Sequence, residues 1–133
     1  MRPVYSASGQ KVNWINYKTG VKHLRFITQT ENKTAIIRIE LSHPDKEIQL
    51  LFLEQFEQMK TFFHETIGEK WEWDKEAYDS LGRPIVLIYK VIDGINVLNK
   101  DDWPRLIDFF KPRMIALDEF WSMAFDTFDD LQR

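Results

Sequence analysis

The chain has 133 residues, of which 44% are hydrophobic and 29% are charged, a length and composition that suit one soluble globular domain. It contains no cysteine, which excludes disulfides, thiolate nucleophiles and cysteine-bound zinc. No run of about 18 apolar residues is present, and the first ten residues lack the apolar segment of a secretory signal, so we expect a cytoplasmic protein without a membrane span.

The formal net charge of −3 hides an uneven distribution along the chain. Residues 1–38 carry seven Lys or Arg side chains and one acid, whereas residues 39–133 carry 11 basic and 20 acidic side chains. Such an asymmetry is typical of a chain with an anionic partner, and equally of one whose two halves attract each other. The charge distribution alone leaves both interpretations open.

The first part of the chain predicts a polar arm followed by a β-hairpin. Residues 1–13 are polar and are expected to form a mobile arm, and residues 14–17 predict a single helical turn before a glycine. Apolar and polar residues alternate in segments 23–26 and 37–41, which is the two-residue period of strands with one buried face. Residues 31–33 are suited to the turn between these strands.

A long amphipathic helix is expected next. Residues 42–45, with the sequence SHPD, are typical of a helix N-terminus with proline in the first turn. Apolar residues then recur every three or four positions from Ile48 to Ile67, and Gly68 follows. The pattern predicts one helix of about 36 Å.

Three further strands are expected after this helix. Residues 71–74 and 85–91 have the alternation or the β-branched content of strands. The dipeptide at 93–94, Asp-Gly, is a strong tight-turn signal, and it predicts a short fifth strand at residues 95–99.

The C-terminal segment predicts a pair of amphipathic helices. Asp101 or Asp102 can cap the first helix. Pro112 predicts a kink or break, because proline removes a helical hydrogen bond and disfavours helical angles at the preceding residue. The order β-β-α-β-β-β-α-α therefore predicts a single two-layer α+β domain over residues 1–133. An antiparallel sheet of about five strands would be covered by the long helix and this proline-kinked pair.

The polar residues suggest no catalytic or metal-binding set. His23, His43 and His64 lie twenty or more residues apart, so no two of them have the spacing typical of metal ligands. Asp118 and Glu119 diverge by about 100° on a helix and cannot converge on one reacting group. We therefore assign no catalytic residue and expect no metal, no other cofactor and no small-molecule ligand, although enzymatic activity stays an open question.

A basic and aromatic stretch near the N-terminus is a candidate nucleic-acid site. It interleaves Trp14 and Tyr17 with Lys18, Lys22 and Arg25. Basic side chains neutralise phosphates, and exposed aromatic rings stack on unpaired bases of DNA or RNA. The alternative, which we favour, is that the rings pack under the sheet edge while the lysines stay in water.

The C-terminal helices carry more aromatic residues than one face of a small sheet needs. We expect the surplus to form an interface with a second copy or with another protein partner, because exposed apolar patches mark such sites. The residues concerned are Phe120, Trp121, Phe125 and Phe128.

Several stretches of the chain share one resemblance. They are VNWINYKTG at 12–20, IELSHPD at 39–45, LFLEQFEQMK at 51–60, WEW at 71–73, KDDWP at 100–104 and FFKPRMIALDEFW at 109–121. Over about residues 11–131 the chain resembles a bacterial family of unknown function, domain-of-unknown-function family 4268.

The resemblance implies either a small standalone protein or the C-terminal part of a longer chain whose front half resembles a PD-(D/E)-x-K nuclease. It supplies no catalytic motif. Similar sequences have a further helix upstream, which suggests a truncated start here. The nuclease motif itself is not found in this chain, since Trp73-Asp74-Lys75 places the acid and the lysine side by side.

Three functions are therefore weighed in order. The first is a non-catalytic interaction module that uses aromatic helix surface. The second is a nucleic-acid-binding accessory domain of a nuclease-like system, which uses the basic N-terminal third. The last is a metal-dependent hydrolase that uses scattered acids such as Glu72 and Asp74.

Overall fold

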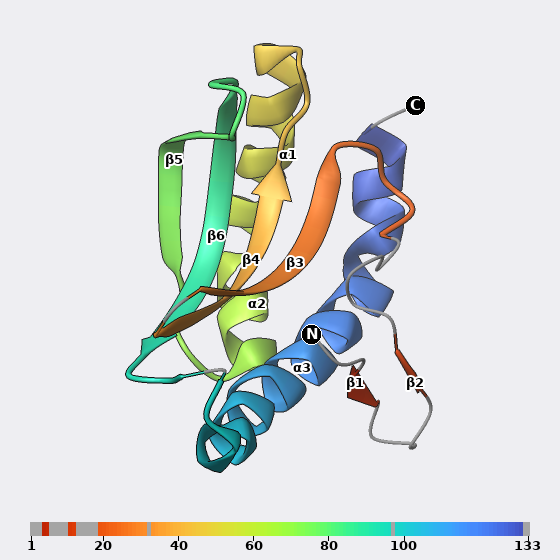
Figure 1. Cartoon of the computed structure of the whole chain (residues 1–133). Coiled ribbons are helices and arrows are strands. Elements are labelled where there is room, and N and C mark those ends of the chain that lie inside the picture. The colour runs from red at the N-terminus through yellow and green to blue at the C-terminus, as the bar shows by residue number, and fades with distance from the viewer. Residues whose placement is uncertain (1–3, 6–10, 13–18, 32, 97, 132–133) are drawn as a thin grey trace.

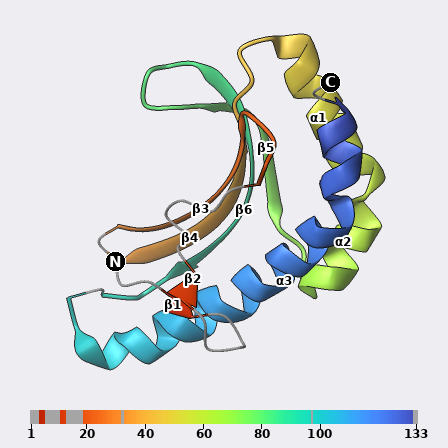
Figure 2. The same cartoon turned by 90° about the vertical axis from the view of Figure 1, so that its right-hand side faces the viewer.

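The chain folds into two layers, a sheet and a set of helices on one side of it, as the computed structural model in Figures 1 and 2 shows. The structure describes residues 4–5, 11–12, 19–31, 33–96 and 98–131. Its elements are β1 (Val4–Tyr5), β2 (Lys11–Val12), β3 (Leu24–Glu31), β4 (Thr34–Leu41), α1 (Lys46–Gln58), α2 (Lys60–Ile67), β5 (Glu72–Tyr78), β6 (Pro84–Asp93), η2 (Lys100–Asp102) and α3 (Trp103–Leu131). The predicted α+β class is confirmed.

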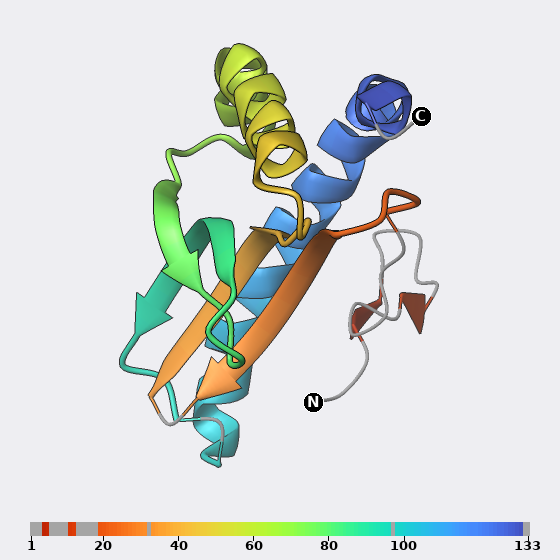
Figure 3. The same ribbon diagram turned by 90° about the horizontal axis from the view of Figure 1, so that it is seen from above.

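The main sheet has four antiparallel strands in the order β3-β4-β6-β5. The pairs Leu24↔Leu41 and Glu31↔Thr34 fix the register of the first hairpin, which the sequence predicted. Strand β6 pairs with β4 on the other side, so β4 and β6 are the central strands. Strands β1 and β2, within the predicted arm, form a separate antiparallel pair that lies beyond the β3 edge in Figure 3.

The prediction of a fifth strand at residues 95–99 is wrong for the residues described there. Ile95 is fully buried, and its N–H donates to the carbonyl of Lys33 at 3.1 Å. The side chains of Asn96 and Asn99 each accept a bond from the backbone N–H two residues later. Such local bonds offer the backbone an alternative to a strand ladder, and here they lead the chain into η2.

The predicted long helix forms in its expected place but is divided into α1 and α2 at Met59, which has φ −95° and ψ 10°. The N-cap is Asp45, whose carboxylate accepts the N–H of Glu47 at 3.0 Å, so Pro44 precedes the cap instead of standing in the first turn. Gly68 ends α2 in the left-handed conformation, as the sequence predicted.

The C-terminal segment is one helix, and the predicted helix pair is wrong. Helix α3 runs through Pro112, and Figure 2 shows it curving as a single element. The guanidinium of Arg113 donates to the carbonyl of Phe109 at 2.8 Å, so a carbonyl within one turn of the proline gains a side-chain partner. Phe110 and Met114 are buried on either side of Pro112, so tertiary packing holds both halves of the helix in line.

The core lies between the sheet and the helices and is dominated by aromatic rings. On the sheet side, Phe26 of β3 meets Trp121 of α3 edge-on, with ring centroids 5.4 Å apart. On the helix side, Phe120 of α3 packs on Phe56 of α1 at 6.2 Å and on Phe63 of α2 at 5.1 Å. Helix α3 therefore packs against the sheet and against the helices α1 and α2, and a wide arc of its surface is buried.

Candidate functional site on the open face of the sheet

Strand β4 divides its side chains between the two faces of the sheet. Ala35, Ile37, Ile39 and Leu41 are fully buried on the helix-covered face. The residues between them point to the other face, which none of the described helices covers and around which the strands curve in Figure 2. This concave open face comprises, by strand register, Arg25, Ile27, Gln29, Glu31, Thr34, Ile36, Arg38, Glu40, Leu87, Tyr89, Val91, Asp93, Glu72 and Asp74.

Cross-strand pairing arranges the open face in rows. Residues directly opposite each other in antiparallel strands share a face and contact one another. The first row is Arg25–Glu40–Leu87–Asp74, the middle row is Ile27–Arg38–Tyr89–Glu72, the third row is Gln29–Ile36–Val91, and the fourth row is Glu31–Thr34–Asp93. Arg38 and Tyr89 therefore lie side by side on the two central strands.

Arg38 occupies the centre of the open face, and its side chain is only 19% exposed. It donates to the Oε1 of Gln29 at 2.7 Å and lies 3.9 Å from Glu40, which is also 3.8 Å from Arg25. Burial lowers the pKa of Arg38, but a guanidinium stays charged at neutral pH. A planar cation in such a position is suited to an aromatic ring or a carboxylate of a partner.

Apolar side chains and Glu40 lie around Arg38, and the other charged residues lie on the outer strands or at the strand ends. Ile27, Ile36, Leu87 and Tyr89 are half-buried, and Val91 is 41% exposed. An apolar centre with a charged rim is the usual anatomy of a protein–protein interface. With Glu31 and Asp93, which the register places on the same side, the open face carries two arginines against five carboxylates, so it does not favour a polyanion.

The structure describes two of the five residues predicted to bind nucleic acid. Trp14, Tyr17 and Lys18 lie outside the described residues. Lys22 and Arg25 are exposed near the start of β3, where Arg25 contributes to the open face. The described basic residues from Lys22 onward are therefore spread along the sheet, with Lys33 at the far end of the β3–β4 hairpin.

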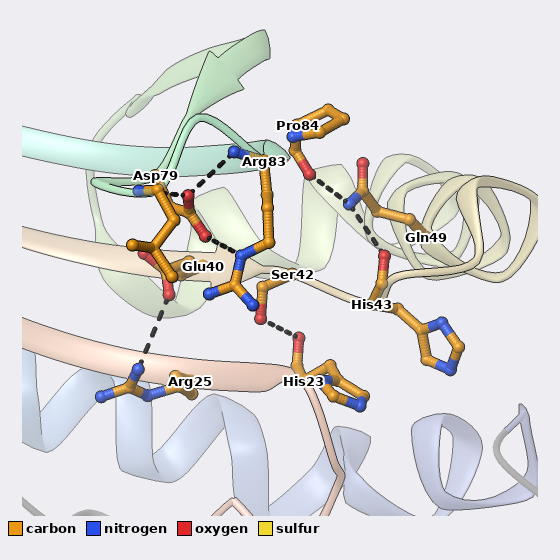
Figure 4. A network of polar contacts seen from close by, with 10 residues as sticks. His23, Arg25, Glu40, Ser42, His43, Gln49, Asp79, Arg83 and Pro84 are labelled. Atoms are coloured by element: carbon orange, nitrogen blue, oxygen red, sulfur yellow. Dashed lines mark hydrogen bonds and ion pairs between the residues drawn. The ribbon is translucent and has the colours of Figure 1, made fainter.

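A polar network closes the end of the sheet where β3 starts and β4 ends (Figure 4). The carboxylate of Asp79 accepts the backbone N–H groups of Leu81 and Arg83 and the Nε of Arg83, the last at 2.7 Å. The backbone bond from Arg83 is the main cause that lowers the pKa of Asp79. These bonds hold the β5–β6 turn in one conformation.

His23 and His43 lie together at the same end of the sheet, with ring centroids 4.9 Å apart in an edge-on arrangement (Figure 4). His23 has a positive φ of 63°, and its carbonyl accepts the N–H of Ser42 at 2.9 Å. Burial, and then the charges of His43, Lys22 and Arg83, lower the pKa of His23. The cations Lys22 and Arg83 therefore lie close enough to His23 to disfavour a charge on its ring.

The four aromatic residues expected at an interface lie in the core or at its margin. Phe120 and Phe128 are fully buried and Trp121 is 4% exposed. Phe125 is half-buried, and its Cε1 lies 2.7 Å from the position that a Cβ on Gly20 would take. This burial argues against an interface there, because α3 is covered by the sheet on one side and by α1 and α2 on another.

Sequence reasoning missed the open face, although one signal for it was present. In the alternation of β4, Ile36 stands at a position where the pattern requires a polar residue, directly before the buried Ile37. Val91 is a similar case on β6. An apolar residue on the solvated side of a strand is the sequence-level sign of a second contact surface.

The acids of the hydrolase hypothesis lie on the β5 edge of the open face, where Glu72 and Asp74 are both exposed. Within the ranges that the structure describes, no three His, Asp or Glu side chains gather closely enough to hold a metal ion. The carboxylate of Asp74 accepts the backbone N–H of Glu76 at 3.0 Å, a local bond within β5.

Comparison with known proteins gives one match. A family model described as Domain of unknown function (DUF4268) matches residues 2–124. Neither the curated proteins nor the solved structures give a match to the chain. Among the described helices, none has both the length and the apolar character needed to cross a membrane.

Proposed function

We propose that this chain, which belongs to the family of domains of unknown function DUF4268, is a non-catalytic module that binds a protein partner through the open face of its sheet. The observation that carries the proposal is the apolar surface around Arg38 on that face, where Ile36, Tyr89 and Val91 stay accessible. The other face of the sheet is already covered by helices. A second apolar surface with a charged rim is typical of a docking site.

The proposal moves the contact surface from the aromatic residues of α3 to the sheet. The rings of Phe120 and Phe128 are occupied within the chain, whereas Val91 is accessible without any unfolding. We keep the cytoplasm as the proposed compartment, since a chain without cysteine draws no stability from an oxidising environment.

Site-specific photocrosslinking in cells that naturally contain the protein tests the proposal. A photoreactive amino acid replaces Val91, and in the control protein it replaces Leu50, which is 47% exposed on α1. We expect crosslinks to protein at position 91, and far fewer at position 50. Equal yields at the two positions, or no crosslink at position 91, would contradict the proposal.

A nucleic-acid-binding role, as an accessory domain of a nuclease-like system, is the second candidate. It is favoured by the basic side chains of Lys22 and Arg83 at the end of the sheet, which contribute to lowering the pKa of His23. Fluorescence titration with single-stranded and duplex DNA across a salt series tests it. We expect affinity to fall with salt, with a slope reduced by about one on Lys22→Ala. No binding at low salt removes this candidate.

A further inference from the structure

We infer that the partner of the open face is a second copy of this chain, related by a two-fold axis parallel to the strands. The inference rests on the proposed function and specifies its partner. With strand order β3-β4-β6-β5, such an axis places β3 opposite β5 of the second copy and β4 opposite β6. Because the axis follows the strands, each row of the open face meets the same row of the second copy.

One pair in each of the first two rows is complementary in charge or chemistry under this operation. In the first row, Arg25 of one copy meets Asp74 of the other, and the contact occurs twice by symmetry. In the middle row, the guanidinium of Arg38 meets the ring of Tyr89, a cation–π pairing. Charge and chemistry therefore match at these two pairs, whereas Glu40 meets Leu87 in the first row and Ile27 meets Glu72 in the middle row.

The third row adds an apolar contact, because Ile36 of one copy meets Val91 of the other. A two-fold axis perpendicular to the strands and centred on the middle row gives the opposite result. It would place Arg38 against Arg38, two like charges in a confined space, which is destabilising. The register of the sheet thus favours one of the two face-to-face arrangements.

The shape of the face requires the central side chains to fill the space between the two copies. Two concave sheets leave the most space at their centre, and the long side chains of Arg38 and Tyr89 stand there. Four strands about 4.8 Å apart and eight residues long give a footprint of about 19 by 26 Å. A footprint of about 500 Å² per copy is at the low end for stable complexes, so we expect a dimer that dissociates in the micromolar range.

Sedimentation velocity across a micromolar dilution series tests the inference. We expect a reversible monomer–dimer equilibrium in the unmodified chain. Val91→Arg places a charge in the apolar third row and should weaken the dimer by at least about tenfold, while its exposed position keeps the monomer folded. Leu50→Arg, at a position of similar exposure on α1, should leave the equilibrium unchanged.

A charge exchange tests the direction of the axis. Arg25→Glu and Asp74→Arg each place like charges opposite each other at both symmetric contacts, so each variant alone should be largely monomeric. In an equal mixture, the introduced glutamate faces the introduced arginine, and native Asp74 faces native Arg25 at the other contact. We therefore expect the mixture to recover dimerisation as a heterodimer.

Thermal unfolding of each variant checks folding, because Arg25→Glu also places a second acid opposite Glu40 within the sheet. If a charge variant unfolds, Val91→Arg still decides whether the open face is the interface. A chain that stays monomeric at all concentrations, or a dimer that Val91→Arg does not weaken, overturns the inference. If Val91→Arg weakens the dimer but mixing the folded charge variants does not restore dimerisation, the proposed direction of the two-fold axis is wrong.

The failure of the inference and that of the proposed function give different results. A monomeric chain whose photocrosslinks at position 91 join it to a different protein overturns the inference and leaves the proposed function standing. A monomeric chain with no crosslink at position 91 overturns both.

Discussion

The two faces of strand β4 carry the same residue type in different surroundings. Ile37 and Ile39 are fully buried beneath the helices, whereas Ile36 is half-buried on the open face. Burial contributes about 0.8 kcal/mol per CH₂ group, so the covered face supplies most of the stability. The comparison shows that β4 stabilises the fold with one face and keeps partly accessible apolar groups on the other, which the proposed function assigns to a partner.

Truncation of one isoleucine on each face gives the largest expected difference. Ile39→Ala should lower the free energy of unfolding by about 2–5 kcal/mol, because it removes packed atoms and leaves a cavity. Ile36→Ala should cost about 1 kcal/mol, since part of its surface already meets water. Urea denaturation at concentrations where the chain is monomeric measures both. Equal costs would show that the open face is packed as tightly as the covered one.

Substitutions at two glycines test whether Phe125, at the edge of the buried surface of α3, packs within the chain. Gly20 has φ +81°, and a Cβ there would lie 2.7 Å from Phe125, whereas Gly82 has φ +78° with nothing within 4 Å. Gly20→Ala should therefore cost about 2–3 kcal/mol, backbone strain plus a clash, and Gly82→Ala about 1 kcal/mol from strain alone.

Chemical denaturation compares the two glycine variants, with Gly20→Ala also placed in a Phe125→Ala background. Phe125→Ala removes the clash and should recover part of the loss caused by Gly20→Ala. The segment around Gly20 is fixed to α3, since Trp121 Nε1 donates to the carbonyl of Thr19 at 2.8 Å. If the two glycine variants lower the free energy of unfolding by the same amount, the Phe125 ring does not pack against Gly20. The ring is then available for contact with another molecule.

The elements with a clear local signal were predictable from the sequence. The first hairpin and the helical region up to Gly68 follow from periodicity and from a glycine in the left-handed conformation. The misses have physical causes that a periodicity search does not see. Asn96 and Asn99 turn the backbone with their own side chains where Asp93-Gly94 predicted a strand, and packing around Pro112 outweighs the lost hydrogen bond.

The candidate site was less accessible to sequence reasoning than the fold. Arg38 and Tyr89 become neighbours only because β6 inserts between β4 and β5, and a sequence does not state strand order. The aromatic residues of α3 were assigned outward for a related reason. The sequence shows how many rings α3 carries, but it does not show that both the sheet and the helix pair α1–α2 pack against it.

The smallest expected effect is a pH dependence from His64, on helix α2 of the covered side. Its Nε2 is buried, with no hydrogen-bond partner in the part of the chain that the structure describes. Burial, and then the charges of Lys60 and Lys70, lower the pKa of His64 below its ordinary value of 6.5. An unfolded histidine binds a proton more readily than His64 does, so the free energy of unfolding should decrease as pH falls through 6.5.

Denaturation between about pH 7 and about pH 5 measures this slope. His23, at the end of the sheet, has a pKa lowered in the same direction and contributes with the same sign. His64→Gln should therefore flatten the slope in part, and His64→Gln combined with His23→Gln should flatten it further. Two results would contradict this: a free energy of unfolding that rises as pH falls over this range, or a slope against pH that neither substitution changes. Either result would mean that both rings accept a proton in the folded chain at least as easily as in the unfolded one. The covered side and the sheet end would then be equally open to water, which the buried Nε2 of His64 argues against.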